Sequence, residues 1–145
     1  MLFKMYLIGR FFYLKRIKIL SKILYHIQKL IFNSSIPHST IIGKNSTFAY
    51  GGIGVVIHSK AILGDSVMIG QGCTIGGRGK GRGIPEIGNK VYIGPGSRIL
   101  GGVKIGDNVI VAPNSVVLID VPANSIIAGV PGKIIKSNIK IDEYL

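Results

Sequence analysis

The sequence predicts a mainly β protein, in which one N-terminal amphipathic α-helix precedes a parallel β-helix of hexapeptide repeats. Two observations carry this prediction. From residue 36 onward an aliphatic side chain returns at nearly every sixth position, and over residues 1–33 the apolar side chains return with helical spacing. A chain of 145 residues is long enough for one folded unit with one core.

The helical prediction covers residues 1–34. One stripe of this helix is apolar and another is basic. The apolar stripe is Tyr13, Ile17, Leu20, Leu24, Ile27 and Ile31, and the other is Lys15, Lys18, Lys22, His26 and Lys29. Charges interrupt every apolar run before about 18 residues, and no small-residue cleavage site follows, so neither a membrane span nor a signal peptide is expected. The helix is expected to cap the β-helix or pack between chains, to bind anionic lipid, or to do both.

The repeat has a period of six, which neither a single strand nor an α-helix produces. Its apolar anchors, all aliphatic except Phe48, are Ile36, Ile42, Phe48, Ile57, Leu63, Ile69, Ile75, Ile87, Ile93, Ile99, Ile105, Val111 and Val117. Such a period is typical of a β-helix, in which each hexapeptide forms one side of a triangular coil. The anchor then points inward, and the glycine that usually follows it eases the chain around the corner.

Two interruptions of the period indicate where function is expected. Nine residues separate Phe48 from Ile57, so three are inserted there. Between Ile75 and Ile87 no aliphatic anchor stands at the sixth position, and an arginine- and glycine-rich run takes its place. Residues 76–86 are therefore predicted to leave the coil as a basic loop. The loop is either a solvated turn or a flap beside a phosphorylated ligand.

His58 stands at a corner position that the repeat otherwise reserves mainly for glycine or alanine. Three hexapeptides make one coil, so residues eighteen apart stack at the spacing of neighbouring strands, about 4.8 Å. Gly76, at the start of the loop, is therefore expected directly beside His58. The imidazole is either a solvated surface group or a functional one.

Charge and cysteine usage narrow the class of partner. The net charge is +12 and the first acid is Asp65, which indicates an anionic partner: a phosphorylated cofactor, a membrane surface or a nucleic acid. No nucleic-acid-reading motif accompanies the charge. Cys73 is the only cysteine, which excludes an intramolecular disulfide and fits a reducing cytoplasm, and its repeat position predicts a core side chain. The three histidines have no zinc-ligand spacing, so no metal is expected.

Two stretches carry a family resemblance. "IGGRGKGRGIPEIGNKVYIGPGSRILGGVKIGDNVIVAPNSVV" and the closing "AGVPGKIIK" resemble hexapeptide-repeat acyltransferases of the serine acetyltransferase branch, and in particular its short relatives that O-acetylate capsule and exopolysaccharide sugars. The resemblance covers residues 36–136. It implies a left-handed β-helix over residues 35–136, a C-terminal tail over 137–145, acetyl-CoA as cosubstrate and a homotrimer.

The expected function is acetyl transfer to a sugar hydroxyl in bacterial surface polysaccharide biosynthesis. The alternatives are serine O-acetylation and a noncatalytic β-helix scaffold. The enzyme is expected in the cytoplasm, with peripheral contact at the inner membrane face.

The resemblance also implies site residues. The family carries one catalytic histidine just before "GIGVV" and one just before Pro85, where this chain has Tyr50 or Gly51, and Ile84. His58 is therefore the expected general base, because imidazole has a reference pKa of about 6.5. Tyr50 is a second catalytic candidate, and the N–H groups of Gly76 and Gly77 are expected to bind the oxyanion. The expected CoA-binding residues are Gly76, Arg78, Lys80, Arg82, Gly94, Gly96, Ser97, Arg98, Ala112 and Lys133.

Overall fold

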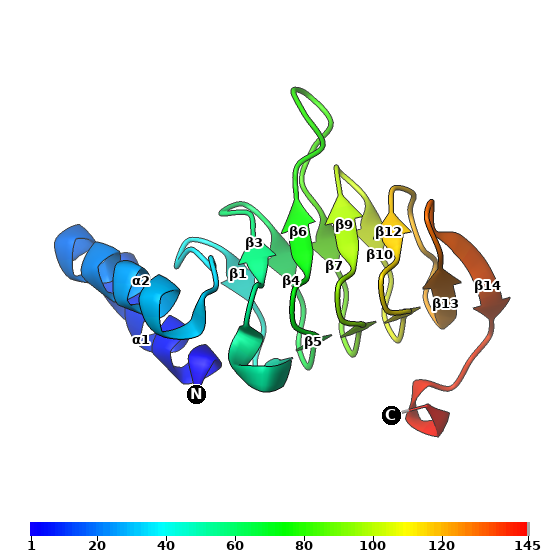
Figure 1. The fold of residues 1–145 in the computed structure, drawn as a ribbon, viewed down its shortest axis with the longest axis horizontal. Helices are drawn as coiled ribbons and strands as arrows, with labels where there is room; N and C mark the ends of the chain where they lie inside the picture. The colour runs from blue at the N-terminus through cyan, green and yellow to red at the C-terminus, as the bar shows by residue number, and fades with distance from the viewer. Residues whose placement is uncertain (145) are drawn as a thin grey trace.

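The computed structural model describes residues 1–144 and confirms the fold class: a left-handed parallel β-helix with helical structure at its N-terminal end (Figure 1). Its short strands stack into three faces. The first face consists of β1 (Ile41–Ile42), β4 (Ile62–Leu63), β7 (Glu86–Ile87) and β10 (Lys104–Ile105). The second consists of β2 (Thr47–Phe48), β5 (Met68–Ile69), β8 (Tyr92–Ile93), β11 (Ile110–Val111), β13 (Ser125–Ala128) and β14 (Lys133–Ser137). The third consists of β3 (Val56–Ile57), β6 (Thr74–Gly76), β9 (Arg98–Leu100) and β12 (Val116–Val117).

The strand register confirms the eighteen-residue coil and both interruptions. Ile57 pairs with Ile75, eighteen positions later. The β4 and β7 partners are 24 positions apart, because six additional residues form the loop between β6 and β7. The β2 and β5 partners are 21 positions apart, because three additional residues form a 3-10 turn at Ala49–Gly52. Each insertion therefore lengthens a connection and leaves the stacking of the anchors intact.

The interior of the coil is filled by the anchors and by the small residues between them. Ile57, Ile75 and Ile99 are almost completely buried in one continuous core. Cys73 is also completely buried, as predicted, with its Sγ 3.2 Å from the carbonyl oxygen of Gly94. Burial raises the pKa of the Cys73 thiol, which keeps it protonated and unreactive.

Half of the six acidic residues serve the coil itself. Asp65 accepts the backbone N–H of Lys44 at 2.9 Å, and Asp107 accepts that of Asn89 at 2.6 Å. Asp120 accepts a third, from a residue of β10, at 2.7 Å. These charge-assisted hydrogen bonds join successive coils at the corners. The three carboxylates are consequently structural groups.

The N-terminal segment forms two helices where the sequence predicted one. α1 (Leu2–Leu14) and α2 (Lys18–Phe32) are joined by a turn in which Arg16 has a left-handed φ of 60°. Together they cover the open N-terminal end of the β-helix (Figure 1). No helix among residues 1–144 has the length and apolar character needed to cross a membrane.

The helices donate hydrogen bonds to carbonyl groups of the first coil, which has no preceding coil to pair with. Tyr6 Oη donates to the Thr40 carbonyl at 2.6 Å, and Gln28 Nε2 donates to the Ile36 carbonyl at 3.1 Å. A buried carbonyl without a donor is costly, so these contacts fix which faces of the helices meet the coil. The cap is therefore oriented by polar contacts as well as by apolar packing.

His38 lies buried at the centre of this cap. Its Nδ1 is 2.9 Å from Ser21 Oγ, and the rings of Tyr6 and Tyr25 flank it with centroids 6.2 Å away. The ring packs so closely on Gly9 that a Cβ there would lie 2.0 Å from Cε1. Burial lowers the pKa of His38 below its usual value, because no carboxylate among these contacts offsets the desolvation of the imidazolium.

The lowered pKa of His38 predicts that acid destabilises the cap. The unfolded chain binds the proton more readily than the folded one, so the stability from neutral His38 is complete above about pH 6.5 and is lost as the pH falls through the folded-state pKa. The midpoint temperature of thermal unfolding should therefore be lower at about pH 5 than at about pH 7.5. The His38→Gln variant should show a shallower dependence, and His26→Gln, which alters an exposed imidazole, should follow the wild type. If the unfolding midpoints of wild type and His38→Gln changed equally with pH, His38 would not be the source of the acid sensitivity.

Candidate active site

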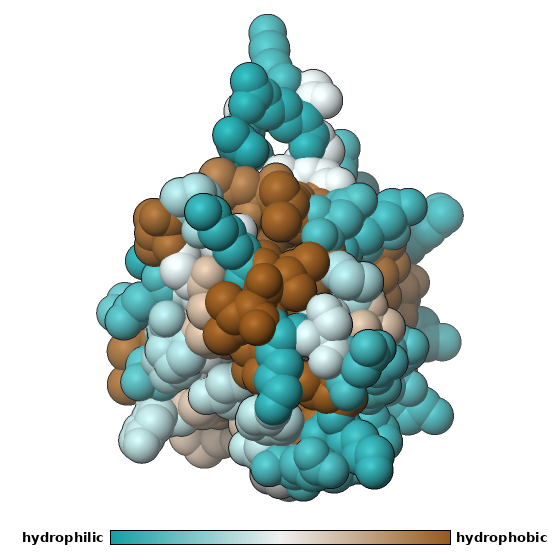
Figure 2. Space-filling model, turned by 90° about the vertical axis from the view of Figure 1, so that its right-hand side faces the viewer, coloured by the Kyte–Doolittle hydropathy of each residue, from teal (hydrophilic) through white to brown (hydrophobic). Residues whose placement is uncertain are grey.

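The basic loop projects from the corner between the third and first faces, where β6 ends and β7 begins (Figures 1 and 2). It rests on the next coil through glycines. The Gly102 N–H donates to the Arg82 carbonyl at 2.5 Å, and a Cβ on Gly83 would lie 2.7 Å from the Gly102 Cα. Only glycine permits this backbone contact, which fixes the base of the loop against the turn at Gly101–Gly102.

A groove of about 400 Å³ opens between the loop and the following coils. Arg78 and Arg82 line one side of it. Its other lining residues are Leu100, Gly101, Gly102, Val103, Leu118, Ile119 and Asp120. Two guanidinium groups and the single carboxylate of Asp120 line the groove, so its net charge is positive, which suits a phosphate-bearing ligand. Lys80 is exposed and does not line the groove.

His58 lies half-buried at the same corner, one coil toward the N-terminus. The backbone N–H of His58 donates to the Ile75 carbonyl at 2.8 Å, so His58 and Gly76 are neighbours as predicted. The imidazole Nδ1 accepts the N–H of Lys60 at 3.1 Å. A neutral ring that accepts at Nδ1 carries its proton on Nε2. To act as a base through Nε2, the ring must first lose the bond to Lys60, at a cost of about 0.5–1.5 kcal/mol.

The two expected oxyanion donors differ in their surroundings. Gly76 belongs to β6, pairs with Leu100, and accepts the N–H of Gly101 at 2.9 Å. Its backbone is therefore part of the sheet. Gly77 is the first residue beyond the strand, so its N–H is the better placed of the two to meet a ligand.

The other expected cofactor residues lie at a different corner. Gly94, Gly96 and Ala112 occupy turns between the second and third faces, across the third face from the loop. Arg98 folds back to this corner, where its Nη1 donates to the carbonyls of Gly72 and Gly96. The cofactor wall expected from the sequence is therefore divided between two edges of one face.

Ser97 and Lys133 need separate placement. Ser97 is completely buried and its hydroxyl donates to the Ala112 carbonyl at 3.0 Å, so this side chain belongs to the core and is unavailable to a cofactor. A place for Ser97 in the cofactor wall therefore stays a prediction that concerns its backbone. Lys133 is exposed at the start of β14, which pairs antiparallel with β13 at the C-terminal end.

The two positions at which the resemblance places histidines also lie at different corners. Tyr50 is 78% exposed in the 3-10 turn between β2 and β3, with a left-handed φ of 49°. Ile84 ends the loop and packs against the core. Within one chain these positions lie at opposite edges of the third face, so a site that uses both requires a second copy.

Comparisons with known proteins place this architecture in a family. The family described as bacterial transferase hexapeptide (six repeats) matches residues 85–118. A serine acetyltransferase of Synechococcus elongatus is 36% identical over 138 residues, which cover 93% of this chain and 56% of that protein. The chain belongs to the hexapeptide-repeat acyltransferase family, on its serine acetyltransferase-like branch.

Solved structures of this branch extend the likeness to ligand complexes. The Brucella abortus serine acetyltransferase with coenzyme A superimposes with a TM-score of 0.88 at 31% identity, covering 95% of this chain and 56% of that one. The Neisseria gonorrhoeae serine acetyltransferase with serine gives a TM-score of 0.86 at 32% identity, covering 93% of this chain and 55% of that one. The chain thus spans about half the length of the acetyltransferases it matches.

These findings correct the expected acceptor. The sequence predicted a sugar of a surface polysaccharide, whereas the matched relatives and solved structures are serine acetyltransferases. The polysaccharide prediction is therefore wrong, and the alternative of serine acetylation is the better supported one.

The far wall of the groove was not predicted from the sequence. Two consecutive glycines, Gly101 and Gly102, stand at a corner that needs only one. This pair could have indicated that another backbone segment packs closely there. Leu118 and Ile119 gave no signal, because aliphatic residues occur throughout the repeat. No group of three His, Cys, Asp or Glu side chains able to hold a metal occurs within residues 1–144.

Proposed function

We propose that this protein transfers the acetyl group of acetyl-CoA to the hydroxyl of serine. The observation that carries the proposal is the likeness to serine acetyltransferases, including complexes with coenzyme A and with serine, over more than nine-tenths of this chain. A corner loop, a groove lined by two arginines and a neighbouring imidazole supply groups that such a transfer needs.

His58 acts as the general base. The serine hydroxyl oxygen attacks the thioester carbonyl carbon while the imidazole takes the hydroxyl proton. The N–H of Gly77 stabilises the oxyanion that forms. The C–S bond then breaks, and His58 returns the proton to the thiolate sulfur, so that O-acetylserine and free CoA leave. A ternary complex suffices, and Cys73 takes no part because it is buried in the core.

The groove holds the phosphates of the cosubstrate. Arg78 and Arg82 face the turn at Gly101–Gly102, two coils beyond His58, which is about 10 Å along the axis at the spacing of parallel strands. Pantetheine is extended, so a CoA molecule anchored in the groove reaches back along the coils toward His58. The exposed loop and Lys80 then close over it.

The proposed assembly is a homotrimer. The site residues at the two edges of the third face meet only when neighbouring β-helices pack side by side, so each interface contributes both corners to one site. Exposed aliphatic side chains on the coil faces, such as Val56, Ile62 and Met68, supply apolar surface for this contact. The unpaired Cys73 fits a reducing cytoplasm.

Removing both arginines should weaken the binding of acetyl-CoA only by removing contacts with its phosphates. A hydrogen bond to a charged group contributes about 1.5–3 kcal/mol, so Arg78→Ala with Arg82→Ala should raise the KM for acetyl-CoA by roughly tenfold or more. The KM for acetyl-pantetheine, which lacks the nucleotide phosphates, should change little. The control is Lys44→Ala, which removes an exposed positive charge outside the groove. Equal losses with both thioesters would contradict phosphate binding in the groove.

A noncatalytic β-helix scaffold is the second candidate, favoured by one observation: Tyr50 and Ile84 occupy the places where the resemblance puts histidines. Titration calorimetry with acetyl-CoA and with desulfo-CoA distinguishes the two. An acetyltransferase binds both in the micromolar to millimolar range that is usual for enzyme substrates. Absence of binding by either ligand would favour the scaffold.

A further inference from the structure

The helical cap presents an apolar surface away from the coil. The side of α2 that meets the coil carries Ser21, Gln28 and Phe32, which are buried. Ten other apolar side chains of the two helices and their connecting turn are between 40% and 87% exposed: Leu7, Ile8, Phe11, Leu14, Ile17, Ile19, Ile23, Ile27, Leu30 and Ile31.

This orientation leaves much of the apolar surface of α2 outside the core. The polar contacts of Gln28 and Ser21 hold α2 to the first coil, so Ile19, Ile23 and Leu30 lie on the opposite side of the same helix. A contiguous exposed apolar surface on a folded domain marks an interaction site. We name this surface the outer cap face.

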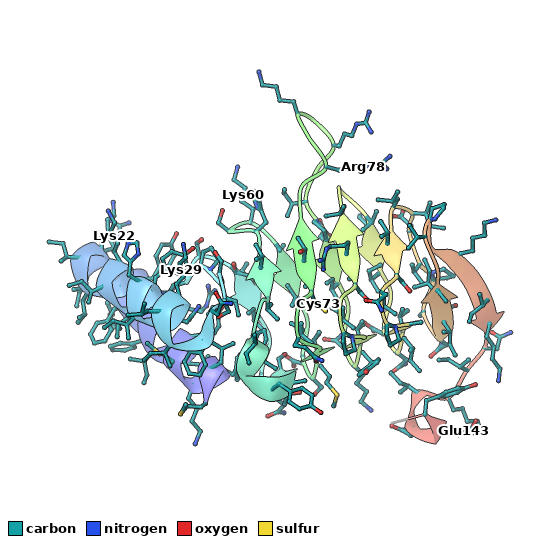
Figure 3. All side chains as sticks on the ribbon, in the orientation of Figure 1. Lys22, Lys29, Lys60, Cys73, Arg78 and Glu143 are labelled. Carbon is teal, nitrogen blue, oxygen red and sulfur yellow. The ribbon has the colours of Figure 1, made fainter. Side chains whose placement is uncertain are left out.

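Positive charge borders the outer cap face and no negative charge balances it. Lys18 begins α2, and Lys22 and Lys29 follow about one and three turns later, at spacings that place the three lysines on one edge of the helix. Lys22 projects on the side of the molecule from which the basic loop rises (Figure 3). The first acid in the chain is Asp65, in the β-helix, so both helices are free of carboxylates.

We propose that the outer cap face docks on the surface of an anionic membrane. Its isoleucines and leucines enter the boundary between headgroups and acyl chains, and the lysines along its edge meet lipid phosphates and carboxylates. A second copy of the same face fits poorly, because pairing would bring two sets of cations together without an acid in either. The proposal concerns a surface separate from the groove and holds whether or not the protein transfers acetyl groups.

The test is co-sedimentation of the full chain with vesicles. The protein should pellet with mixed phosphatidylcholine–phosphatidylserine vesicles and bind pure phosphatidylcholine vesicles about tenfold more weakly or worse. Added salt should weaken binding, since exposed charges are screened. Lys18→Glu with Lys22→Glu and Lys29→Glu should abolish the preference for anionic lipid, and Ile19→Ser with Leu30→Ser should reduce binding to both kinds of vesicle.

The matched control is Ile135→Ser, which alters a 64% exposed isoleucine on β14 at the opposite end of the molecule, and it should bind as the wild type does. Thermal unfolding verifies that each variant is folded. Equal binding to neutral and anionic vesicles, or no binding to either, would overturn the proposal. So would self-association of the wild type, seen by analytical ultracentrifugation, that Leu30→Ser abolishes, because the face would then belong to a second copy. Acetyl transfer measured without lipid reports separately on the enzymatic proposal.

Discussion

Replacement of His58 by alanine should lower serine acetylation by roughly a hundredfold or more while acetyl-CoA binds with unchanged affinity. General-base catalysis contributes about 10²- to 10⁴-fold, and the imidazole lies at the corner beside Gly76 and at a distance from the arginine groove. The loss should therefore appear in kcat, with the dissociation constant for CoA from calorimetry unaltered. The side chain is half-buried and its single side-chain hydrogen bond is to Lys60, so the fold should tolerate the change.

Two further variants sharpen this result. His26→Ala removes an exposed imidazole from α2 and should leave the rate unchanged. Tyr50→Phe removes the hydroxyl at the position where the resemblance places a histidine. If Tyr50→Phe abolishes acetylation while His58→Ala retains it, the base has been assigned to the wrong residue.

Truncation of a core anchor should produce the largest loss of stability. Ile99→Ala removes a completely buried side chain from β9, between the anchors of β6 and β12. Isoleucine-to-alanine changes in well-packed cores cost about 2–5 kcal/mol. The urea midpoint should fall accordingly, because the stacked coils cannot collapse inward to fill the cavity without breaking the register of both neighbours.

Ile135→Ala is the matched control, since this side chain is 64% exposed on β14, and it should change the free energy of unfolding by less than about 0.5 kcal/mol. Comparable losses for the two variants would mean that the anchors do not carry the core. That outcome would contradict the account of the repeat.

The repeat made the β-helix predictable from sequence because each hexapeptide encodes its own inward residue and its own corner. The insertion after Phe48 and the loop after Ile75 were visible for the same reason, since each is a departure from a fixed count. The neighbourhood of His58 and Gly76 followed from the eighteen-residue coil. These features depend on local periodicity, which a single sequence contains.

Features that depend on contacts between different helices and strands were not predictable from the repeat. The turn at Arg16 is not marked by glycine or proline, so one helix was expected where two form. The orientation of α2 depends on the hydrogen bond that Gln28 donates to a carbonyl of the first coil. Helical periodicity alone would have predicted that the apolar stripe is buried.

The acceptor of the acetyl group could not be predicted from sequence patterns for a related reason. The hexapeptide repeat specifies a scaffold, and the groups that select an acceptor lie at corners contributed by different parts of the fold. Tyr50 and Ile84 differ from the family residues expected at their positions, so these two positions did not indicate serine. The likeness to serine acetyltransferases over nearly the whole chain outweighs those two positions.

Direct detection of the product tests the central claim. The protein would be incubated with acetyl-CoA and serine, O-acetylserine would be quantified by mass spectrometry, and released CoA would be titrated as free thiol in the same samples. The account predicts O-acetylserine and free thiol in equal amounts, both dependent on serine and both lost in His58→Ala. Binding of acetyl-CoA with no serine-dependent thiol release would contradict it.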